Sequence, residues 1–355
     1  MMKYRTVAGT RWWDEALTQQ RCERLPCGHE FSQFLLQQAI SLLVCSKQDA
    51  CVFMISATGR DGECEIASVS VPEAMGLAVS EGNLVIGAGR ELRLWRDLTS
   101  ANPHISVFVP TVSHAIGRCS VHDVAFHPLN GKIIFLNTLF SSVSGLDECA
   151  AFRQIWRPGF IKEEGPVDCA HLNGLALGCG GEMIVTMLST TGNAMGWRNQ
   201  SIDAGVLYDA CTDTPLLEGL CLPHSPVFFG KSLWFLESGK GRLLRITEPG
   251  AASEIAVLPG LTRGLALCQG MAFVGISRLR QSSVATFELL NRRFGSRLAC
   301  EISLLDAVTG RVTGGLKLPS ISEISSLHIY PKPKVRLLEP NGKNRDEMYI
   351  FSEEK

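Results

Sequence analysis

The sequence lacks a long apolar run, a strong charge of either sign and a paired cysteine motif of the kind that binds metals. No stretch of about 18 apolar residues is present, so no transmembrane helix is expected. The 34 basic and 35 acidic residues are well mixed and give a formal net charge of −1. This balance excludes the basic footprint of a nucleic-acid-binding or membrane-surface protein, and we expect neither partner.

The 13 cysteines include no CxxC pair, and residues 1–6 lack the hydrophobic core of a secretory signal. An odd number of thiols without such a signal is typical of a reduced protein, so a cytoplasmic location is expected. Several of these cysteines lie in apolar runs, where they are expected to pack as small buried hydrophobes.

What the chain does contain is a short repeated pattern, a chemically distinctive residue followed by a small apolar run. It recurs roughly every 40 to 60 residues, a period typical of the four-stranded units of a β-propeller. The occurrences are residues 75–79, 122–126, 171–177, 224–228, 263–267 and, more weakly, 323–327. The 34 glycines and the 45% hydrophobic fraction suit a single domain of this kind.

We therefore predict an all-β fold, a six-bladed β-propeller over residues 40–335. Residues 41–45, 51–55 and 64–70 form only three strands, one fewer than a blade requires. The missing inner strand is expected from residues 323–330 near the other end of the chain. The ring would then close by pairing of N- and C-terminal strands, which removes exposed sheet edges.

The two ends of the chain follow different patterns. Residues 1–39 form the predicted short helical N-terminal extension, because residues 12–20 and 31–40 carry apolar positions three and four apart. The first of these helices would cover a mouth of the propeller or pack on an outer blade edge. Residues 336–355 are the predicted C-terminal tail, a surface extension in which residues 348–351 are expected to dock.

The residues that lead the six patterns should meet at one mouth of the channel, because equivalent ends of inner strands converge in a propeller. They are Met75, His122, His171, His224, Arg263 and Glu323. Three of the eight histidines are thus predicted at the same register of consecutive inner strands. The remaining ones, such as His104, His114 and His127, are expected to lie elsewhere.

Two kinds of chemistry fit these residues. The neutral imidazoles of His122, His171 and His224 suit a divalent transition metal, Zn, Fe or Cu, with an open position for water or substrate. Without metal, a histidine would act as general acid or base while Arg263 holds an anionic group. A third interpretation is a channel that is merely lined by hydrogen-bonded polar residues.

Neighbouring residues add to the candidate site. Asp123 and Asn173 lie close enough in sequence to orient a histidine or a ligand, and together with Glu323 they complete the predicted catalytic set. Asp168 and the pair at 237–238 are further candidates, although turn formation explains Asp168 and Ser238 better. The Trp-Arg pairs at 156–157 and 197–198 fit either a carboxylate or peptide pocket or ordinary packing.

The favoured function is an enzyme that acts on an anionic small molecule or modified peptide at the channel mouth, since three aligned histidines exceed what a scaffold requires. The alternative is a non-catalytic ligand-binding or protein-interaction propeller, because the fold does not fix the function.

Motifs at residues 137–140, 156–161, 171–176, 223–226 and 233–239 occur together in a bacterial family of conserved hypothetical β-propeller proteins. The chain resembles this family over about residues 40–335. The resemblance implies a propeller and, in some members, fusion to tetratricopeptide repeats, but no established activity. Residues 167–170 and Val227 depart from the family pattern, as does the region after Glu323, so its substrate contacts are not carried over to this chain.

Overall fold

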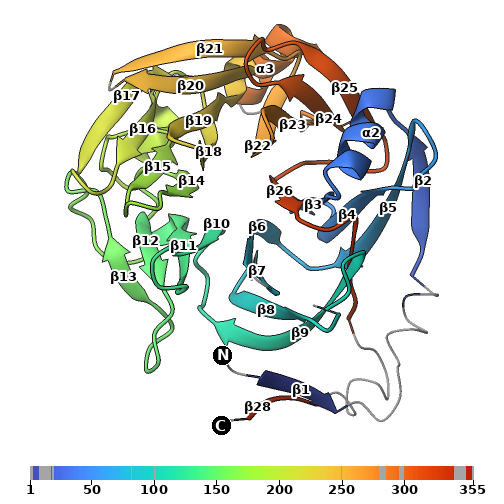
Figure 1. The fold of residues 1–355 in the computed structure, drawn as a ribbon. Coiled ribbons are helices and arrows are strands. Elements are labelled where there is room, and N and C mark those ends of the chain that lie inside the picture. Colours follow the sequence, from blue (N-terminus) through green and yellow to red (C-terminus); the bar gives the residue numbers. More distant parts are fainter. Residues whose placement is uncertain are drawn as a thin grey trace.

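The inner strands form where the repeated patterns predicted them, because their apolar residues alternate between the two faces of a blade. The computed structural model describes residues 3–7, 17, 20–80, 82–99, 101–248, 250–279, 285–295, 300–339 and 349–353. Six sheets surround a central channel (Figure 1). Their innermost strands are β6 (Ala74–Ser80), β10 (Val121–Phe126), β14 (Leu172–Leu177), β18 (Pro223–Phe229), β22 (Leu261–Cys268) and β26 (Ser326–Tyr330).

Blades two to six each continue outward in chain order. Blade two adds β7 (Asn83–Ala88), β8 (Glu91–Asp97) and β9 (Ile105–Ala115), and blade three adds β11 (Ile133–Asn137), β12 (Ser142–Gly145) and β13 (Arg153–Trp156). Blade four adds β15 (Met183–Met187), β16 (Gly205–Asp209) and β17 (Thr214–Leu220). Blade five adds β19 (Ser232–Glu237), β20 (Arg242–Glu248) and β21 (Ala251–Val257), and blade six adds β23 (Met271–Ser277), β24 (Cys300–Asp306) and β25 (Val312–Leu318). Sequence patterns missed β9, β12, β17 and β21, since β12 is short and the others lie at or near an exposed edge.

The predicted closure of the ring is confirmed. Strand β26 pairs antiparallel with β3 (Ser41–Ser46), from Ser326 opposite Cys45 to Tyr330 opposite Ser41. Strands β4 (Cys51–Ala57) and β5 (Glu63–Ser70) complete this closing blade. The two ends of the propeller sequence are therefore held together within one sheet.

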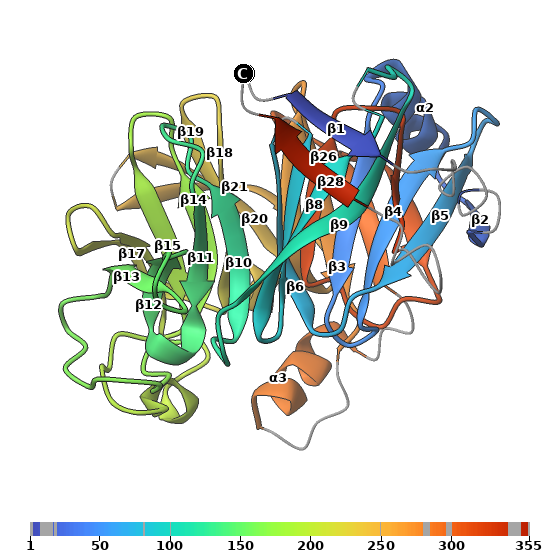
Figure 2. The same cartoon turned by 90° about the horizontal axis from the view of Figure 1, so that it is seen from below.

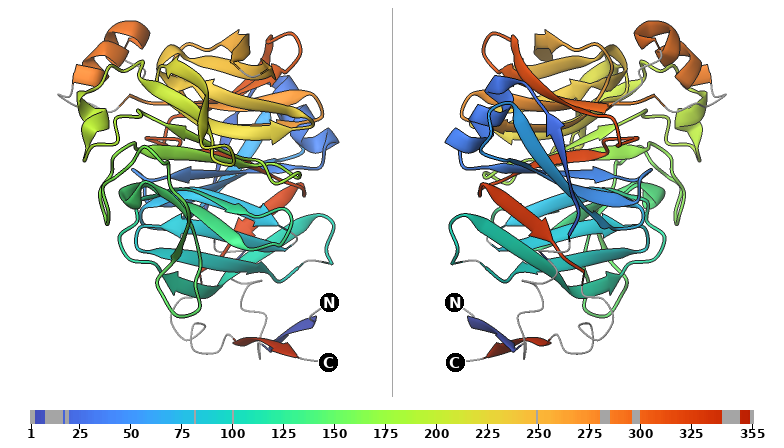
Figure 3. Two further views of the ribbon diagram at one scale, coloured as in Figure 1. Left: turned by 90° about the vertical axis from the view of Figure 1, so that its left-hand side faces the viewer. Right: turned by 90° about the vertical axis from the view of Figure 1, so that its right-hand side faces the viewer.

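Both ends of the chain also contribute strands that the sequence patterns did not predict. Strand β2 (Cys22–Pro26) pairs with β5, so the N-terminal extension is not purely helical. Strand β27 (Lys334–Leu337) pairs in parallel with β9 and crosses the expected boundary at residue 335. Outside the six sheets, β1 (Lys3–Val7) pairs with β28 (Tyr349–Glu353) in a two-stranded ribbon (Figures 2 and 3). The tail therefore begins as a blade strand rather than as a surface extension.

The second predicted helix forms as α2 (His29–Gln37). Its buried Phe31 meets Phe273 of blade six edge to face, with ring centroids 5.6 Å apart, and packs in the same cluster as Leu42 of the closing blade. The helix therefore seals the junction between the first and last blades. The other predicted helix, at residues 12–20, lies almost entirely outside the described residues.

An unpredicted helix, α3 (Ala285–Phe294), is inserted between β23 and β24 and stands on one face of the ring (Figure 2). Its Arg293 donates a hydrogen bond to the carbonyl oxygen of Gly239, in the 3-10 turn η3 (Ser238–Lys240) of blade five. In the described ranges, no helix is long and apolar enough to cross a membrane.

Five inner strands share an irregularity at the same point. In β6 the pairing register shifts between Ala74 and Leu77, in β10 between Val121 and Val124, and β14, β18 and β22 shift correspondingly. Such a bulge adds one residue and re-aims the side chains beside it. The shifted segment begins at Met75, His122, Asn173 and Arg263 in four of these strands, whereas in β18 it begins just after His224, which still pairs with Leu236.

In alternate blades the next residue is a glycine that lies against the neighbouring inner strand. These residues are Gly76, Gly174 and Gly264. A Cβ atom on Gly76 would lie 2.6 Å from the Cα of Asp123, and one on Gly264 would lie 2.7 Å from the Cβ of Leu327. Because real Cβ atoms do not approach so closely, the glycines let adjacent inner strands meet around the channel.

Candidate functional site

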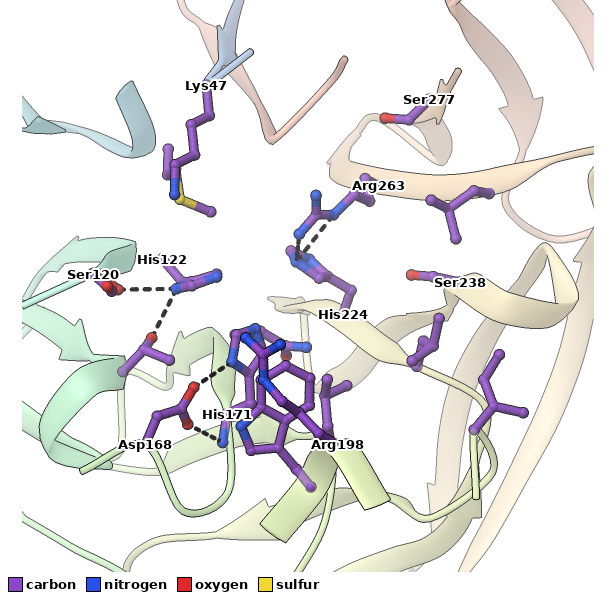
Figure 4. Close-up of a pocket in the computed structure, with 18 of the residues that line it drawn as sticks. Lys47, Ser120, His122, Asp168, His171, Arg198, His224, Ser238, Arg263 and Ser277 are labelled. Atoms are coloured by element: carbon purple, nitrogen blue, oxygen red, sulfur yellow. Dashed lines mark hydrogen bonds and ion pairs between the residues drawn. The ribbon is translucent and has the colours of Figure 1, made fainter. Parts of the chain in front are cut away.

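One end of the central channel widens into a cavity of about 630 Å³. It lies where the inner strands begin, on the face that carries α3, whose Leu290 forms part of the wall (Figures 2 and 4). Its volume lies within the range of small-molecule sites. Of the predicted catalytic residues, those that line this cavity are His122, His171, Asn173, His224, Arg263 and Glu323.

The imidazole of His122 points into the cavity from the bulge of β10 (Figure 4). Its Nδ1 lies 2.9 Å from the carbonyl oxygen of Ser120 and 2.8 Å from Oγ1 of Thr138. The Thr138 hydroxyl donates its own proton to the carbonyl oxygen of Leu172, at 2.6 Å. Because a carbonyl can only accept, Nδ1 carries the ring proton and Nε2 keeps its lone pair. Burial, followed by the nearby His171, lowers the pKa of His122 well below its usual value, so the ring is neutral at pH 7.

Asp168 orients His171 from the turn before β14. Its two oxygens accept the backbone N–H and the Nδ1–H of His171, at 2.8 and 2.7 Å. Trp197 packs against the other side, with ring centroids 4.2 Å apart. The ring lies 4.9 Å from that of His122, so two imidazoles are adjacent with Nε2 unused by the described residues. An imidazole held by a carboxylate in this way is suited to proton transfer.

His224 is arranged differently. Its Nε2 accepts hydrogen bonds from Nη2 and Nε of Arg263 at 3.1 and 3.3 Å, while Nδ1 faces the hydroxyl of Ser225 at 3.0 Å. Since guanidinium is only a donor, the ring is neutral and both nitrogens are engaged. Burial, and then Arg263, lower the pKa of His224 well below its usual value. Arg263 also forms an ion pair with the buried Glu323, at 2.7 Å.

The three histidines do not all occupy one register. His122 and His224 are each the second residue of their inner strand, but in β14 that position belongs to Asn173, and His171 lies two residues earlier. His171 has a left-handed backbone with φ of +53°, like Ser120, at +52°, before β10. It thus reaches the cavity from the turn that precedes the strand.

Asp123 and Asn173 serve neighbouring strands more than the cavity. Asp123 accepts the backbone N–H groups of Val124 and Leu175, each at 2.9 Å, which ties β10 to β14. It faces a second cavity of about 440 Å³ at the opposite end of the channel, and burial raises its pKa to about 7. Asn173 accepts a hydrogen bond from Thr186 Oγ1 at 2.7 Å. Among the described residues, neither the Asp123 carboxylate nor the Asn173 amide forms a hydrogen bond with the imidazole of His122 or His171.

Cationic side chains were the main feature that the sequence patterns missed. Lys47, Arg118 and Arg278, which no pattern singled out, line the cavity in addition to Arg263 and to Arg198 of the predicted Trp-Arg pair. Among the described lining residues the acids are Asp168 and Glu323, which are bonded to His171 and Arg263. The cavity therefore favours an anionic ligand.

The signals for these cations were positional. Lys47 directly follows β3, and Arg118 lies two residues before Ser120, so both sit at strand ends that face the mouth. Trp197 and Arg198 do line the cavity, and the Arg198 guanidinium lies 4.8 Å from the Trp197 ring. The other pair is elsewhere, since Trp156 packs against Tyr208 at 5.8 Å.

The donor geometry does not fit the predicted metal site of His122, His171 and His224. Among the described residues, no group of three or more His, Cys, Asp or Glu side chains is placed to hold a metal ion. The reason is His224, because a cation at its Nε2 would compete with a permanently charged guanidinium. Only His122 and His171 keep adjacent imidazole nitrogens available.

The fold and the site define a six-bladed β-propeller with a cationic, histidine-containing cavity at one mouth. Residues 29–337 match the family described as a domain of unknown function, DUF4915. The chain belongs to this family. A search of curated proteins found no relative.

Solved structures resemble the fold at low sequence identity. A chain of a nidogen/laminin complex has a TM-score of 0.56 at 11% identity, covering 82% of this chain and 99% of that chain. A protein of unknown function from Bacteroides caccae has a TM-score of 0.50 at 11% identity, with coverage of 82% and 98%. A gluconolactonase from Xanthomonas campestris reaches 0.49 at 11% identity, with coverage of 82% and 92%. The first two likenesses show the fold, and none of the three carries an activity over to this chain.

Proposed function

We propose that the chain is an enzyme that binds an anionic small molecule, or the anionic end of a modified peptide, and transfers a proton to or from it. The observation that carries this proposal is the Asp168–His171 pair, which faces a cavity whose described lining includes five cationic side chains, Arg263 among them. A carboxylate-oriented imidazole supplies a general acid or base, and the cations supply binding energy for the anion.

The contacts of each residue in the cavity indicate its role. His171 is the proton-transferring group, because Asp168 fixes the orientation of its ring through Nδ1. His122 is a neutral acceptor whose Nε2 faces the same space. Lys47 and Arg118 attract the anion, and Arg263 is held in place by Glu323.

A non-catalytic binding module is the second candidate, because the same cationic cavity would hold an anion without transforming it. The two are separated by incubating a bacterial metabolite extract with wild-type protein and with His171→Asn, and following every metabolite by mass spectrometry. An enzyme consumes an anionic metabolite in the wild-type sample and loses at least a hundredfold of that rate in the variant. His104→Asn, at an exposed histidine, is the matched control and keeps the rate.

Binding is tested separately by the shift in melting temperature with citrate and with pyrophosphate. Lys47→Ala and Arg118→Ala should reduce the shift, because each removes one cation from the wall. Binding without consumption of any metabolite would favour the second candidate. Elemental analysis of protein purified without a histidine tag tests the metal-dependent version, for which stoichiometric Zn, Fe or Cu is required.

A further inference from the structure

Three hydroxyl side chains occupy equivalent places around the cavity, at the end of the second strand in blades three, five and six. They are Thr138, Ser238 and Ser277, and all line the cavity. Thr138 and Ser238 directly follow Asn137 and Glu237, which pair with the first residues of their inner strands, and Ser277 is the last residue of β23 and pairs with Leu261, the first residue of β22. A comparison among the three shows what each hydroxyl does.

Two of the three join their own blade to the next one. Thr138 donates to the carbonyl oxygen of Leu172 in β14, at 2.6 Å. Ser277 donates to the carbonyl oxygen of Ile324 at 2.9 Å and accepts the Ile324 N–H at 3.0 Å. Both hydroxyls are therefore used within the protein, and each stabilises the contact between adjacent blades.

Ser238 departs from this pattern. Its side chain is only 2% exposed, yet its Oγ has no hydrogen-bond partner in the described part of the chain. The Oγ1 of the fully buried Thr262, on the next inner strand, is likewise unpartnered there, so the joining contact is absent between blades five and six. Figure 4 shows the Ser238 oxygen directed into the cavity, on a different side from Lys47.

A buried hydroxyl without a hydrogen-bond partner destabilises the folded protein relative to a paired one. Native proteins keep few such groups, and each calls for a reason. The cavity explains why Ser238 Oγ is unpaired, because this oxygen faces a space that is large enough for a ligand and is bordered by Leu290 of α3. The missing partner of Ser238 is therefore best sought in the ligand.

We infer that Ser238 is a ligand-binding residue whose hydroxyl donates a hydrogen bond to an anionic oxygen, of a carboxylate or phosphate, in the molecule bound in the cavity. The inference rests on the proposed function for the charge of that molecule. Because Ser238 and Lys47 lie on different sides of the cavity, the ligand spans it and carries acceptor oxygens at both ends. This describes a small polyanion rather than a monocarboxylate.

The test compares Ser238→Ala with Ser277→Ala, its matched control in the next blade. Without ligand, Ser238→Ala should leave the melting temperature unchanged or slightly raised, because it removes an unpaired buried group. Ser277→Ala should lower it by about 2 °C or more, since it breaks two hydrogen bonds between blades. Calorimetry with citrate as the probe should then show a Kd about tenfold weaker for Ser238→Ala than for the wild type.

The outcomes are distinct. If Ser238→Ala melts as low as Ser277→Ala, the hydroxyl joins blades and the inference is wrong. If citrate binds Ser238→Ala as tightly as the wild type, Ser238 does not contact the ligand, while the anion site itself stands. If citrate and pyrophosphate fail to bind the wild type at all, the proposed anion site is refuted and the inference fails with it.

Discussion

Gly264 offers a quantitative test of how closely the inner strands approach one another. Its backbone has φ of +79°, and an added Cβ would lie 2.7 Å from the Cβ and 2.9 Å from the backbone N of Leu327 in the closing blade. Gly270, at φ of +76°, has nothing within 4 Å of such an atom. The two glycines therefore share a left-handed backbone and differ in contact, so Gly270→Ala is a matched control for Gly264→Ala.

The expected magnitudes follow from this difference. Alanine in the left-handed region costs about 1–2 kcal/mol, which is the whole expected loss for Gly270→Ala. Gly264→Ala adds overpacking against Leu327, about 1–3 kcal/mol, for a total of about 2–5 kcal/mol. Urea denaturation, with m-values compared, measures both free energies of unfolding. If the two variants lose the same free energy of unfolding within about 0.5 kcal/mol, the inner strands do not approach each other this closely at Gly264.

Two further predictions concern the buried histidine and the ring closure. Burial holds the folded-state pKa of His122 below its unfolded value of about 6.5, so its contribution to stability is present above that pH and is lost as pH falls below it. His122→Asn keeps a hydrogen-bond donor for the Ser120 carbonyl but does not titrate. Its melting temperature should therefore drop less than that of the wild type between pH 7.5 and pH 5. Equal drops would contradict a lowered pKa for His122. Leu327, 2% exposed, packs with Val44 across the closing pair, and Leu327→Ala should cost about 2–5 kcal/mol in urea denaturation. The control, Val308→Ala at an 81% exposed site, should stay within about 0.5 kcal/mol, and a similar loss in both would argue against closure by β26.

The sequence predicted the blades because each inner strand is a compact apolar run with a distinctive leading residue. Closure was predictable for a similar reason, since residues 41–70 lacked one strand and residues 323–330 supplied one. Strands such as β17 and β21 were not predicted, because edge strands are largely exposed and show no clear alternation of apolar and polar residues. The pairing of β27 with β9 joins segments far apart in sequence, which local patterns do not encode.

The sequence predicted which histidines line the candidate site but not how their side chains are arranged in it. Alignment of the repeated pattern brought His122, His171 and His224 to one cavity, yet it placed His171 two residues out of register. The exclusive use of His224 by Arg263 and Ser225 depends on side-chain directions that the spacing does not determine. The Asp168 carboxylate both shapes its turn and orients His171, so the turn interpretation was correct but incomplete.

The seam between β3 and β26 has a consequence for the order in which the site is built. Just beyond that pair, the backbone N–H of Lys47 donates to Oγ of Ser325 at 3.2 Å, a contact between residues 278 positions apart in the chain. Closing so long a loop is entropically costly and must await synthesis of the last blade strands. Strands β6 to β9 of blade two and the strands of blades three to six pair with their neighbours in sequence, so they can fold while the chain is still growing, before β27 joins β9. Lys47 is made early but is fixed beside the cavity only when Ser325 arrives together with Glu323. A nascent chain that stops before residue 320 would therefore contain most of the propeller and no complete binding cavity.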